Sequence, residues 1–484
     1  MKLNNPELLR SQCLINGEWC DALSGKREAV INPATGAELA SIPLVSEEET
    51  QQAIAAAQRA QNEWKQLTAK QRSALLLAWA DKVLAAQEDL AQLMTAEQGK
   101  SLAEARGEVA YAASFITWFA EEAKRVDGAV LQAPQASQRL VVVKQPIGVC
   151  AAITPWNFPA AMITRKVAPA LAAGCAIIVK PAEQTPLTAL ALAKLAQDAG
   201  IPAGVLQVVT GEAAQVGKVL CDSPVVRKLS FTGSTEVGRI LMAQCAPSIK
   251  KLSLELGGNA PVIVFDDANL DAAVAGIMAS KFRNSGQTCV CANRIYVQDG
   301  IYERLAEKLV AAVEQLKVGD GSQEGTTQGP LIDSDAVAKV QSHIDDALIK
   351  GAQIATGGQP HAFGGTFFQP TVVTGVTQKM RFAKEETFGP VAPLFRFHDE
   401  AEAIAMANDT EFGLAAYLFT QNAARQWRVP EALEYGMVGI NTGLISNEVA
   451  PFGGVKQSGL GREGSRYGIE EYLELKYLCI DVSC

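Results

Sequence analysis

The chain has 484 residues, of which 48% are hydrophobic and 20% are charged, so it is long enough for about three globular domains. Its net charge of −9 argues against binding to nucleic acids or to acidic membranes, because both roles need a basic surface. The longest apolar stretch, residues 167–179, contains Pro169 and Gly174 and is too short to span a bilayer, so no membrane partner is expected.

Ten cysteines are scattered along the chain, and the polar residues 1–10 do not look like a signal peptide. We therefore expect reduced thiols and a cytoplasmic location rather than a disulfide framework. His343, His361 and His398 lie far from any close pair of cysteines, which disfavours a zinc site. No bound metal is expected.

The periodicity of apolar residues changes along the chain. Residues 12–45 are rich in turns and short β-prone runs, whereas residues 47–125 place Ala and Leu at three- and four-residue spacing, which predicts helices. From about residue 138, short β-prone runs alternate with helical runs, and a second alternating block begins near Pro261. This alternation predicts an α/β fold with a parallel, doubly wound sheet.

Two segments that lie far apart in the sequence look like exposed strands. Residues 138–144 contain a β-branched run flanked by charges, and in residues 471–482 apolar side chains alternate with Glu474 and Lys476. Exposed strands need covering, and pairing across subunits is one solution. The chain is therefore expected to form a homo-oligomer, either a dimer or a dimer of dimers (a homotetramer).

Cys289 follows Gly-Gln-Thr just after a predicted helix. It is either an exposed nucleophile, whose thiolate is favoured by dipoles or a cation, or a small buried hydrophobe. No histidine lies in a motif-like segment, which disfavours a papain-like mechanism. Cys291 is two residues further on, and two thiols this close either form a strained, reversible disulfide that blocks Cys289 or leave Cys291 packed in the core.

Glu255 lies in an apolar strand that ends in Gly257 and Gly258. A carboxylate in this setting is either a desolvated general base with a raised pKa or the partner of a buried cation. The two glycines allow another part of the chain, or a ligand, to come close.

A strand–turn–helix pattern covers residues 228–245, with the turn at Gly233 and Ser234. Amide groups at a helix N-terminus attract phosphate, so the pattern is compatible with a phosphate-containing ligand. However, Gly233 and Gly238 have G-x-x-x-x-G spacing instead of the ordinary dinucleotide fingerprint. The pattern alone fits an ordinary strand–helix turn equally well.

Glu-Leu-Gly-Gly at residues 255–258 followed by Gly-Gln-Thr-Cys at 286–289 resembles the two active-site signatures of the aldehyde dehydrogenase superfamily. The resemblance extends over nearly the whole chain. It is carried by five further motifs in the family's order: Pro-Trp-Asn-Phe-Pro at 155–159, Lys-Pro-Ala-Glu at 180–183, Phe-Thr-Gly-Ser at 231–234, Glu-Thr-Phe-Gly-Pro at 386–390 and Pro-Phe-Gly-Gly at 451–454.

The resemblance implies definite catalytic roles. Cys289 is expected to attack the aldehyde, and Asn157 together with the backbone N–H of Cys289 is expected to form the oxyanion hole. Glu255 is expected to activate the water that hydrolyses the thioester. Lys166 and Glu463 match positions that support proton relay.

The resemblance also implies NAD or NADP as cofactor. Glu183 is expected to accept hydrogen bonds from the adenine ribose and to repel a 2′-phosphate, which favours NAD, although Lys180 can tolerate the phosphate. Ser234 is expected to contact the pyrophosphate, and Glu386 the nicotinamide ribose. The other expected cofactor contacts are Trp156, Gly233, Leu256 and Phe388.

Within the superfamily, the resemblance is greatest to the succinate-semialdehyde dehydrogenases, through residues 161–166, 282–284, 289–294 and 443–446. It implies that the substrate is a small carboxylated aldehyde. Its carboxylate is expected to be held by Arg165, Arg283 and Ser446, because arginine is an always-charged, bidentate donor. For each arginine, the alternative is a structural ion pair.

The expected reaction is therefore the oxidation of succinate semialdehyde to succinate, a step that the family implies in 4-aminobutyrate degradation. Glutarate semialdehyde differs by one methylene, worth only ~1–3 kcal/mol, so it stays an alternative, as does another aldehyde. A non-catalytic homologue is a third hypothesis, and the presence of Cys289, Glu255 and Asn157 disfavours it.

The resemblance implies three parts. Residues 1–130 and 146–256 form a Rossmann-like, doubly wound NAD(P)-binding domain, residues 257–455 form an α/β catalytic domain, and residues 131–145 and 456–484 form an oligomerisation segment of β-strands. The expected fold class is thus α/β with a small β-strand extension.

Overall fold

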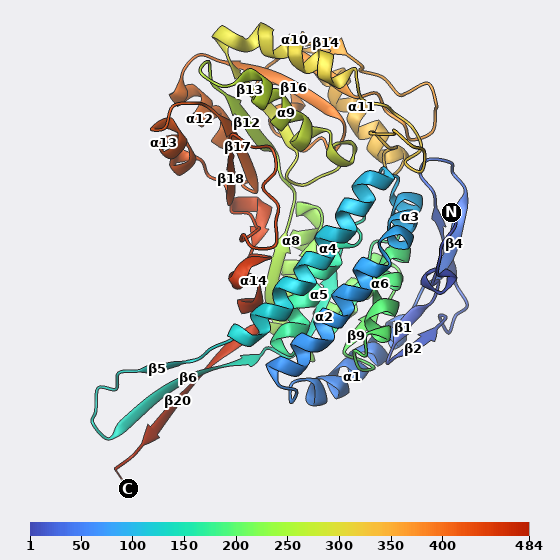
Figure 1. Ribbon diagram of the computed structural model, residues 1–484, viewed down its shortest axis with the longest axis vertical. Coiled ribbons are helices and arrows are strands. Elements are labelled where there is room, and N and C mark those ends of the chain that lie inside the picture. The colour runs from blue at the N-terminus through green and yellow to red at the C-terminus, as the bar shows by residue number, and fades with distance from the viewer. Residues whose placement is uncertain (484) are drawn as a thin grey trace.

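The computed structural model describes residues 1–483, and Figure 1 shows two layered α/β bodies with a thin β-extension that carries the C-terminus. The largest sheet has the strand order β19-β11-β10-β7-β8-β9-β1-β2, in which β11, β10, β7, β8 and β9 are parallel. Its strands are β1 (Cys13–Ile15), β2 (Glu18–Cys20), β7 (Val149–Ile153), β8 (Ile177–Lys180), β9 (Leu206–Val208), β10 (Val226–Thr232), β11 (Lys251–Glu255) and β19 (Gly459–Leu460).

Helices cover both faces of this sheet. In β7, Cys150 and Ala152 pack into one apolar cluster, whereas Val149 and Ala151 pack into another on the opposite face. Both faces are therefore buried, as in a doubly wound sheet. The helices of this body are α1 (Glu47–Trp64), α2 (Ala69–Ala85), α3 (Gln87–Gln98), α4 (Leu102–Glu122), α5 (Ala161–Ala173), α6 (Pro186–Asp198), α7 (Ala213–Asp222), α8 (Thr235–Cys245) and α14 (Ser465–Glu470).

The second sheet has the order β14-β15-β16-β13-β12-β17-β18, and all its pairings are parallel except β14 with β15. Its strands are β12 (Ala260–Val264), β13 (Ala292–Gln298), β14 (Gln353–Thr356), β15 (Thr371–Val376), β16 (Val391–Phe397), β17 (Ala415–Phe419) and β18 (Met437–Ile440). The helices around it are α9 (Leu270–Lys281), α10 (Tyr302–Val313), α11 (Ser334–Ile349), α12 (Glu400–Asn408) and α13 (Arg425–Ala432). The predicted α/β fold class is confirmed.

The extension is a three-stranded antiparallel sheet of β5 (Ala129–Leu131), β6 (Gln138–Pro146) and β20 (Leu473–Asp481) (Figure 1). The two exposed strands that the sequence predicts therefore exist, and they pair with each other. A smaller hairpin joins β3 (Arg27–Ile31) to β4 (Glu38–Pro43).

The chain returns to the first body before it reaches the extension. β19 pairs with β11, and α14 packs against α4 and α5, so residues 459–470 contact the first sheet and its helices. The proposed domain boundaries stay a prediction. Among residues 1–483, no helix combines the length and apolar character that crossing a membrane requires.

Candidate active site

A cavity of about 330 Å³ lies at the carboxyl ends of β7, β10 and β11, where the parallel strands of an α/β sheet commonly present ligand sites. Its wall continues onto α11 and the segment after β15. Eight of the residues predicted from the sequence line this one cavity: Trp156, Asn157, Gly233, Ser234, Leu256, Cys289, Glu386 and Phe388.

The loop before Cys289 is held in an unusual backbone conformation. Asn284, Ser285 and Gly286 all have φ between 51° and 74°, a left-handed region that costs free energy for residues with a side chain. The loop is tied down by a hydrogen bond from Asn284 N to Glu104 Oε1 (2.7 Å) and one from Ser285 Oγ to the Gly329 carbonyl (2.9 Å). The tertiary structure therefore aims Cys289 at the cavity.

The two sequence signatures meet in space at Gly258. A Cβ on this residue would lie 2.5 Å from the carbonyl oxygen of Cys289, closer than any side chain tolerates. The glycine pair after Glu255 thus allows the backbone of Cys289 to pack against the end of the strand that carries Glu255. The expected close approach of another chain segment is confirmed.

The Cys289 thiol is a protonated group in this arrangement. Burial raises its pKa to about 12, and the charges of Glu386, Glu255 and Glu463 act in the same direction. Arg165 opposes them and favours the thiolate. To act as a nucleophile, the thiol therefore has to lose its proton, and positive charge near it promotes that loss.

Asn157 lies at the cavity wall together with Cys289 and is anchored through both its side-chain amide and its backbone carbonyl. Its Nδ2 donates to the Gln287 carbonyl (3.1 Å), and its own carbonyl accepts from Lys100 Nζ (2.8 Å) and Asn284 Nδ2 (2.9 Å). Lys100 also forms an ion pair with Glu108 that is fully shielded from water. This buried pair connects α4 to the loop that carries the candidate oxyanion donor.

Glu108 accepts two further hydrogen bonds, from Ala160 N (2.9 Å) and Ala161 N (3.2 Å) at the start of α5. Replacing Glu108 with alanine leaves the buried Lys100 charge without its carboxylate partner and with only the Asn157 carbonyl as acceptor. We expect the free energy of unfolding to fall by about 3–5 kcal/mol, measured by urea denaturation followed by circular dichroism. Turnover falls as well, because the Asn157 loop loses anchors.

The matched control is Glu88→Ala, since Glu88 pairs with Arg106 from a side chain that is 46% exposed. Exposed pairs are worth at most about 1 kcal/mol, so this variant stays close to the unsubstituted protein. Equal destabilisation by the two substitutions would contradict the larger contribution to stability that we assign to the buried Lys100–Glu108 pair.

Glu255 is the last residue of β11 and its side chain is shielded from water. Its carboxyl oxygens have no hydrogen-bond partner among residues 1–483. Burial raises its pKa well above the ordinary value, and the charge of Glu463 adds to this effect. Arg165, Lys166 and Arg462 oppose the shift. Of the two interpretations made from the sequence, the raised pKa of a desolvated base fits this geometry better than a direct ion pair.

Arg165, Lys166 and Glu463 form a buried charge cluster next to Glu255. The Nε of Arg165 lies 2.8 Å from Glu463 Oε2, and Lys166 pairs with the other carboxyl oxygen. Burial raises the pKa of Glu463, but the charges of Lys166 and Arg165 outweigh burial and lower this pKa below its ordinary value. The cluster therefore holds an ionised Glu463 beside a Glu255 that tends to stay protonated.

The three expected substrate-binding residues are not joined by hydrogen bonds in the described part of the chain. Arg165 makes an ion pair with Glu463, which is the structural alternative predicted for it. Its buried Nη2 has no hydrogen-bond partner among residues 1–483. The guanidinium of Arg283 lies 4.8 Å from the ring centre of Phe158. Ser446 is half-buried in the loop after β18. None of the three lines the main cavity.

Cys291 is buried behind the nucleophile, and its thiol donates to the Lys281 carbonyl (3.3 Å). Both Cys289 and Cys291 are free thiols. The packing of Cys291 in the core agrees with the second interpretation made from the sequence, and a reversible disulfide stays a prediction.

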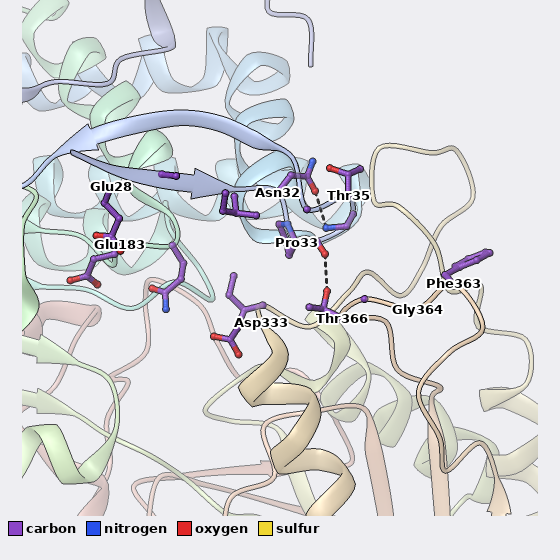
Figure 2. A pocket seen from close by; sticks show the side chains of 16 residues that line it. Glu28, Asn32, Pro33, Thr35, Glu183, Asp333, Phe363, Gly364 and Thr366 are labelled. Carbon is purple, nitrogen blue, oxygen red and sulfur yellow. Dashed lines mark hydrogen bonds between the residues drawn. The ribbon is translucent and has the colours of Figure 1, made fainter. Parts of the chain in front are cut away.

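A second cavity of about 560 Å³ adjoins the first, and the two share Ile332 and Asp333 as wall residues. Figure 2 shows Glu183 at one end of this second cavity. Lys180, at the end of β8, forms an ion pair with Glu183. Two adjoining cavities with different linings fit an elongated ligand such as a dinucleotide.

The cavity wall has features that suit such a ligand. α8 begins at the cavity, and the Ser234 side chain caps it by accepting from Val237 N (3.3 Å). Trp156 and Phe388 pack edge to face with ring centres 5.5 Å apart. Glu386 accepts from Gly258 N (3.1 Å), and burial raises its pKa to about 7. The residues therefore fit a nicotinamide dinucleotide whose phosphates lie at a helix N-terminus.

Ten of the residues that line the main cavity were not among the site residues predicted from the sequence, and four of them illustrate why. Met162 and Thr232 lie inside recognised motifs, so their neighbours provided a signal. Asp333 and Lys339 come from the N-terminal half of α11, where no motif marks them. The fold alone brings this helix, in the second body, to the cofactor-like cavity of the first.

A model of the aldehyde dehydrogenase family matches residues 19–478. A succinate-semialdehyde dehydrogenase (NADP⁺) of Escherichia coli K12 is 65% identical over 480 residues, which cover 99% of this chain and 100% of the relative. A glutarate-semialdehyde dehydrogenase of Pseudomonas putida is 64% identical, with full coverage of both chains. The crystal structure of a succinate-semialdehyde dehydrogenase from Burkholderia pseudomallei superimposes with a TM-score of 0.99 at 63% identity, with both chains fully covered.

The chain belongs to the aldehyde dehydrogenase family. The expected family is thereby confirmed. It agrees with Cys289 and Asn157 in one cavity wall and with Glu255 at the end of β11, outside the residues that line that cavity.

Proposed function

We propose that this aldehyde dehydrogenase oxidises succinate semialdehyde to succinate with NAD or NADP. The observation that carries the proposal is the placement of Cys289 and Asn157 in one cavity wall, with the buried cation Arg165 acting on the thiol. The names of similar proteins refer to succinate semialdehyde, glutarate semialdehyde and 3-sulfolactaldehyde. All three are small aldehydes with an anionic group. These names therefore support the class of substrate more strongly than the number of carbon atoms between its aldehyde and its anionic group.

Glutarate semialdehyde is the second candidate, because a relative of that name is 64% identical over the whole chain. The two substrates differ by one methylene, and a pocket discriminates such a difference by only ~1–3 kcal/mol. The ratio of kcat/KM for the two aldehydes, measured on the same preparation, decides between them.

The chain's own residues account for the chemistry. The Cys289 thiol releases its proton to solvent and its Sγ forms a bond to the aldehyde carbon, while the π pair of the carbonyl moves onto the oxygen. Asn157 Nδ2 and the Cys289 N–H donate to this oxygen as it becomes negative. When bound, the nicotinamide group supplies a hydride acceptor. Loss of hydride from the tetrahedral carbon leaves a thioester on Cys289. Glu255 then takes a proton from water, the hydroxide oxygen bonds to the acyl carbon, and the thiolate departs.

Buried charges support the second half of this sequence. Lys166 and Arg165 hold Glu463 ionised. The charge of Glu463 raises the pKa of Glu255, and the two cations lower it. A proton taken up by Glu255 can then be passed toward the Lys166–Glu463 pair. This relay is part of the proposal.

The proposed carboxylate contact is tested with Arg283→Met. We expect kcat/KM for succinate semialdehyde to fall about 100-fold, because the carboxylate of the substrate loses a charged donor. The value for neutral pentanal stays within about threefold. Both are measured by the absorbance of reduced nicotinamide. Arg165 is the less suitable target, because its removal leaves Glu463 without one of its partners.

The control for this test is Arg466→Met, which changes an exposed arginine on α14. It is expected to leave both values unchanged. Equal losses for the charged and the neutral aldehyde in Arg283→Met would contradict a role in binding the carboxylate.

Assembly into a homo-oligomer is supported by the surface of the extension. Its strands expose large apolar side chains, and so does α8, and exposed apolar area of this kind marks interaction surfaces. The clearest examples are Val130, Ile240, Met242, Leu475, Tyr477 and Ile480. Dimers and dimers of dimers both bury such surfaces. A cytoplasmic location is also proposed, since the cysteines among residues 1–483 are free thiols.

A further inference from the structure

Glu28 reaches the second cavity from an unexpected part of the chain. It lies on β3, in the two-stranded hairpin outside the large sheet, whereas Glu183 follows β8 of that sheet. Figure 2 shows the two carboxylates at the same end of the cavity, with Glu28 next to Glu183. Their proximity also has an electrostatic signature, because partial burial and the charge of Glu183 raise the pKa of Glu28.

The positive charge of Lys180, at this end of the cavity, is already paired with a carboxylate. Lys180 is buried and forms its ion pair with Glu183. Its charge is therefore balanced by Glu183, and Glu28 adds a second carboxylate that no ion pair within the described residues neutralises. Asp333, a third carboxylate of the wall, accepts from Ala336 N (2.8 Å) at the start of α11, where the two cavities join. The end of the cavity near Glu28 therefore carries an excess of negative charge.

We propose that Glu28 is a second specificity-determining residue, which acts with Glu183 to exclude a phosphate from the adenosine ribose and to favour NAD over NADP. The inference rests on the proposed function, because it takes the dinucleotide to lie across both cavities. A ribose hydroxyl donates hydrogen bonds to carboxylates, whereas a phosphate is repelled by both. Lys180 alone does not offset this repulsion, since it is shared with Glu183.

The test is equilibrium binding, measured by calorimetry with two fragments of the cofactors. Adenosine 2′,5′-bisphosphate carries the discriminating phosphate, and 5′-AMP lacks it. Glu28→Gln keeps the size and hydrogen-bonding capacity of the side chain and removes its charge. We expect it to tighten binding of the bisphosphate about five- to tenfold and to leave 5′-AMP within about twofold, with the gain shrinking at high salt. Glu183→Gln is measured alongside, and the double variant gives the combined effect.

The matched control is Glu38→Gln, on the partner strand of the same hairpin and outside the cavity wall. It is expected to change neither affinity. Circular dichroism and the melting temperature show whether each variant is folded, and exposed positions such as Glu28 and Glu38 tolerate this change.

The outcomes separate the two proposals. If 5′-AMP and NAD bind every variant but Glu28→Gln gives no selective gain for the bisphosphate, the role of Glu28 is wrong and the proposed function stands. If Glu28→Gln strengthens both fragments equally, the residue acts through general charge and the inference is also overturned. If neither 5′-AMP nor NAD binds the unsubstituted protein, the cofactor site itself is wrong, and both proposals fall.

Discussion

Cys289→Ser is expected to lower the rate of nicotinamide reduction by on the order of 10⁴-fold, because the reaction loses its covalent nucleophile. Burial raises the pKa of the Cys289 thiol to about 12. A serine hydroxyl is far less acidic than a thiol, so it would lose its proton even less readily at this position. No histidine lines the main cavity, so no imidazole is in place to activate the hydroxyl. The measurement is the absorbance of reduced nicotinamide with succinate semialdehyde at saturating cofactor.

Cys20→Ser makes the same chemical change on β2, remote in sequence and outside the cavity. It should keep the rate within about twofold. Mass spectrometry after treatment with iodoacetamide adds a second measurement, since the aldehyde substrate should protect Cys289 and not Cys20. A Cys289→Ser protein that reduced the nucleotide at the native rate would refute the thioester mechanism.

Glu255→Gln is expected to separate the two halves of the reaction. The first turnover still produces reduced nicotinamide, because Cys289 attacks and hydride is lost without the base. The thioester then accumulates, since glutamine cannot take a proton from water, and the steady-state rate falls by about 10²–10⁴-fold. Rapid mixing should therefore show a burst of about one equivalent per active site, followed by a slow phase.

The pH dependence of the steady-state rate tests the same group. Only the carboxylate form of Glu255 accepts a proton, and burial raises its pKa well above the ordinary value. The rate is therefore expected to rise with pH through a range above that of ordinary carboxyl groups, as the base form becomes populated. In Glu255→Gln this rise disappears from the slow phase.

Glu434→Gln is the control for both measurements, because Glu434 is an exposed carboxylate paired with Lys456. It should retain the full rate and the same pH profile. If Glu255→Gln abolished the burst as well as the slow phase, Glu255 would be required for the attack of Cys289 and its assignment to hydrolysis alone would be wrong.

Local patterns predicted most of the elements of this fold. The spacing of Ala and Leu over residues 47–125 predicted helices, and in the structure capping boxes at Ser46 and Thr68 start α1 and α2. The alternation of strand-like and helix-like runs predicted the doubly wound sheet, because strands and helices repeat their apolar residues at different spacings. Boundaries were less accurate where an element changes type. The helix predicted just before Cys289 is α9, which ends at Lys281, and a 3₁₀ turn with left-handed residues continues to Gly286.

By itself, the amino-acid sequence determined the family and predicted which residues are the nucleophile and the base, because both inferences depend on short motifs whose residues are neighbours in the chain. Only the tertiary structure decided what surrounds them. Glu463 is 297 residues away from Lys166 in the sequence, yet it pairs with both Lys166 and Arg165. Glu28, from a separate hairpin, lines the same cavity as Glu183. The physical reason is that burial and charge act through space, so the order of strands in the sheets sets which charges meet.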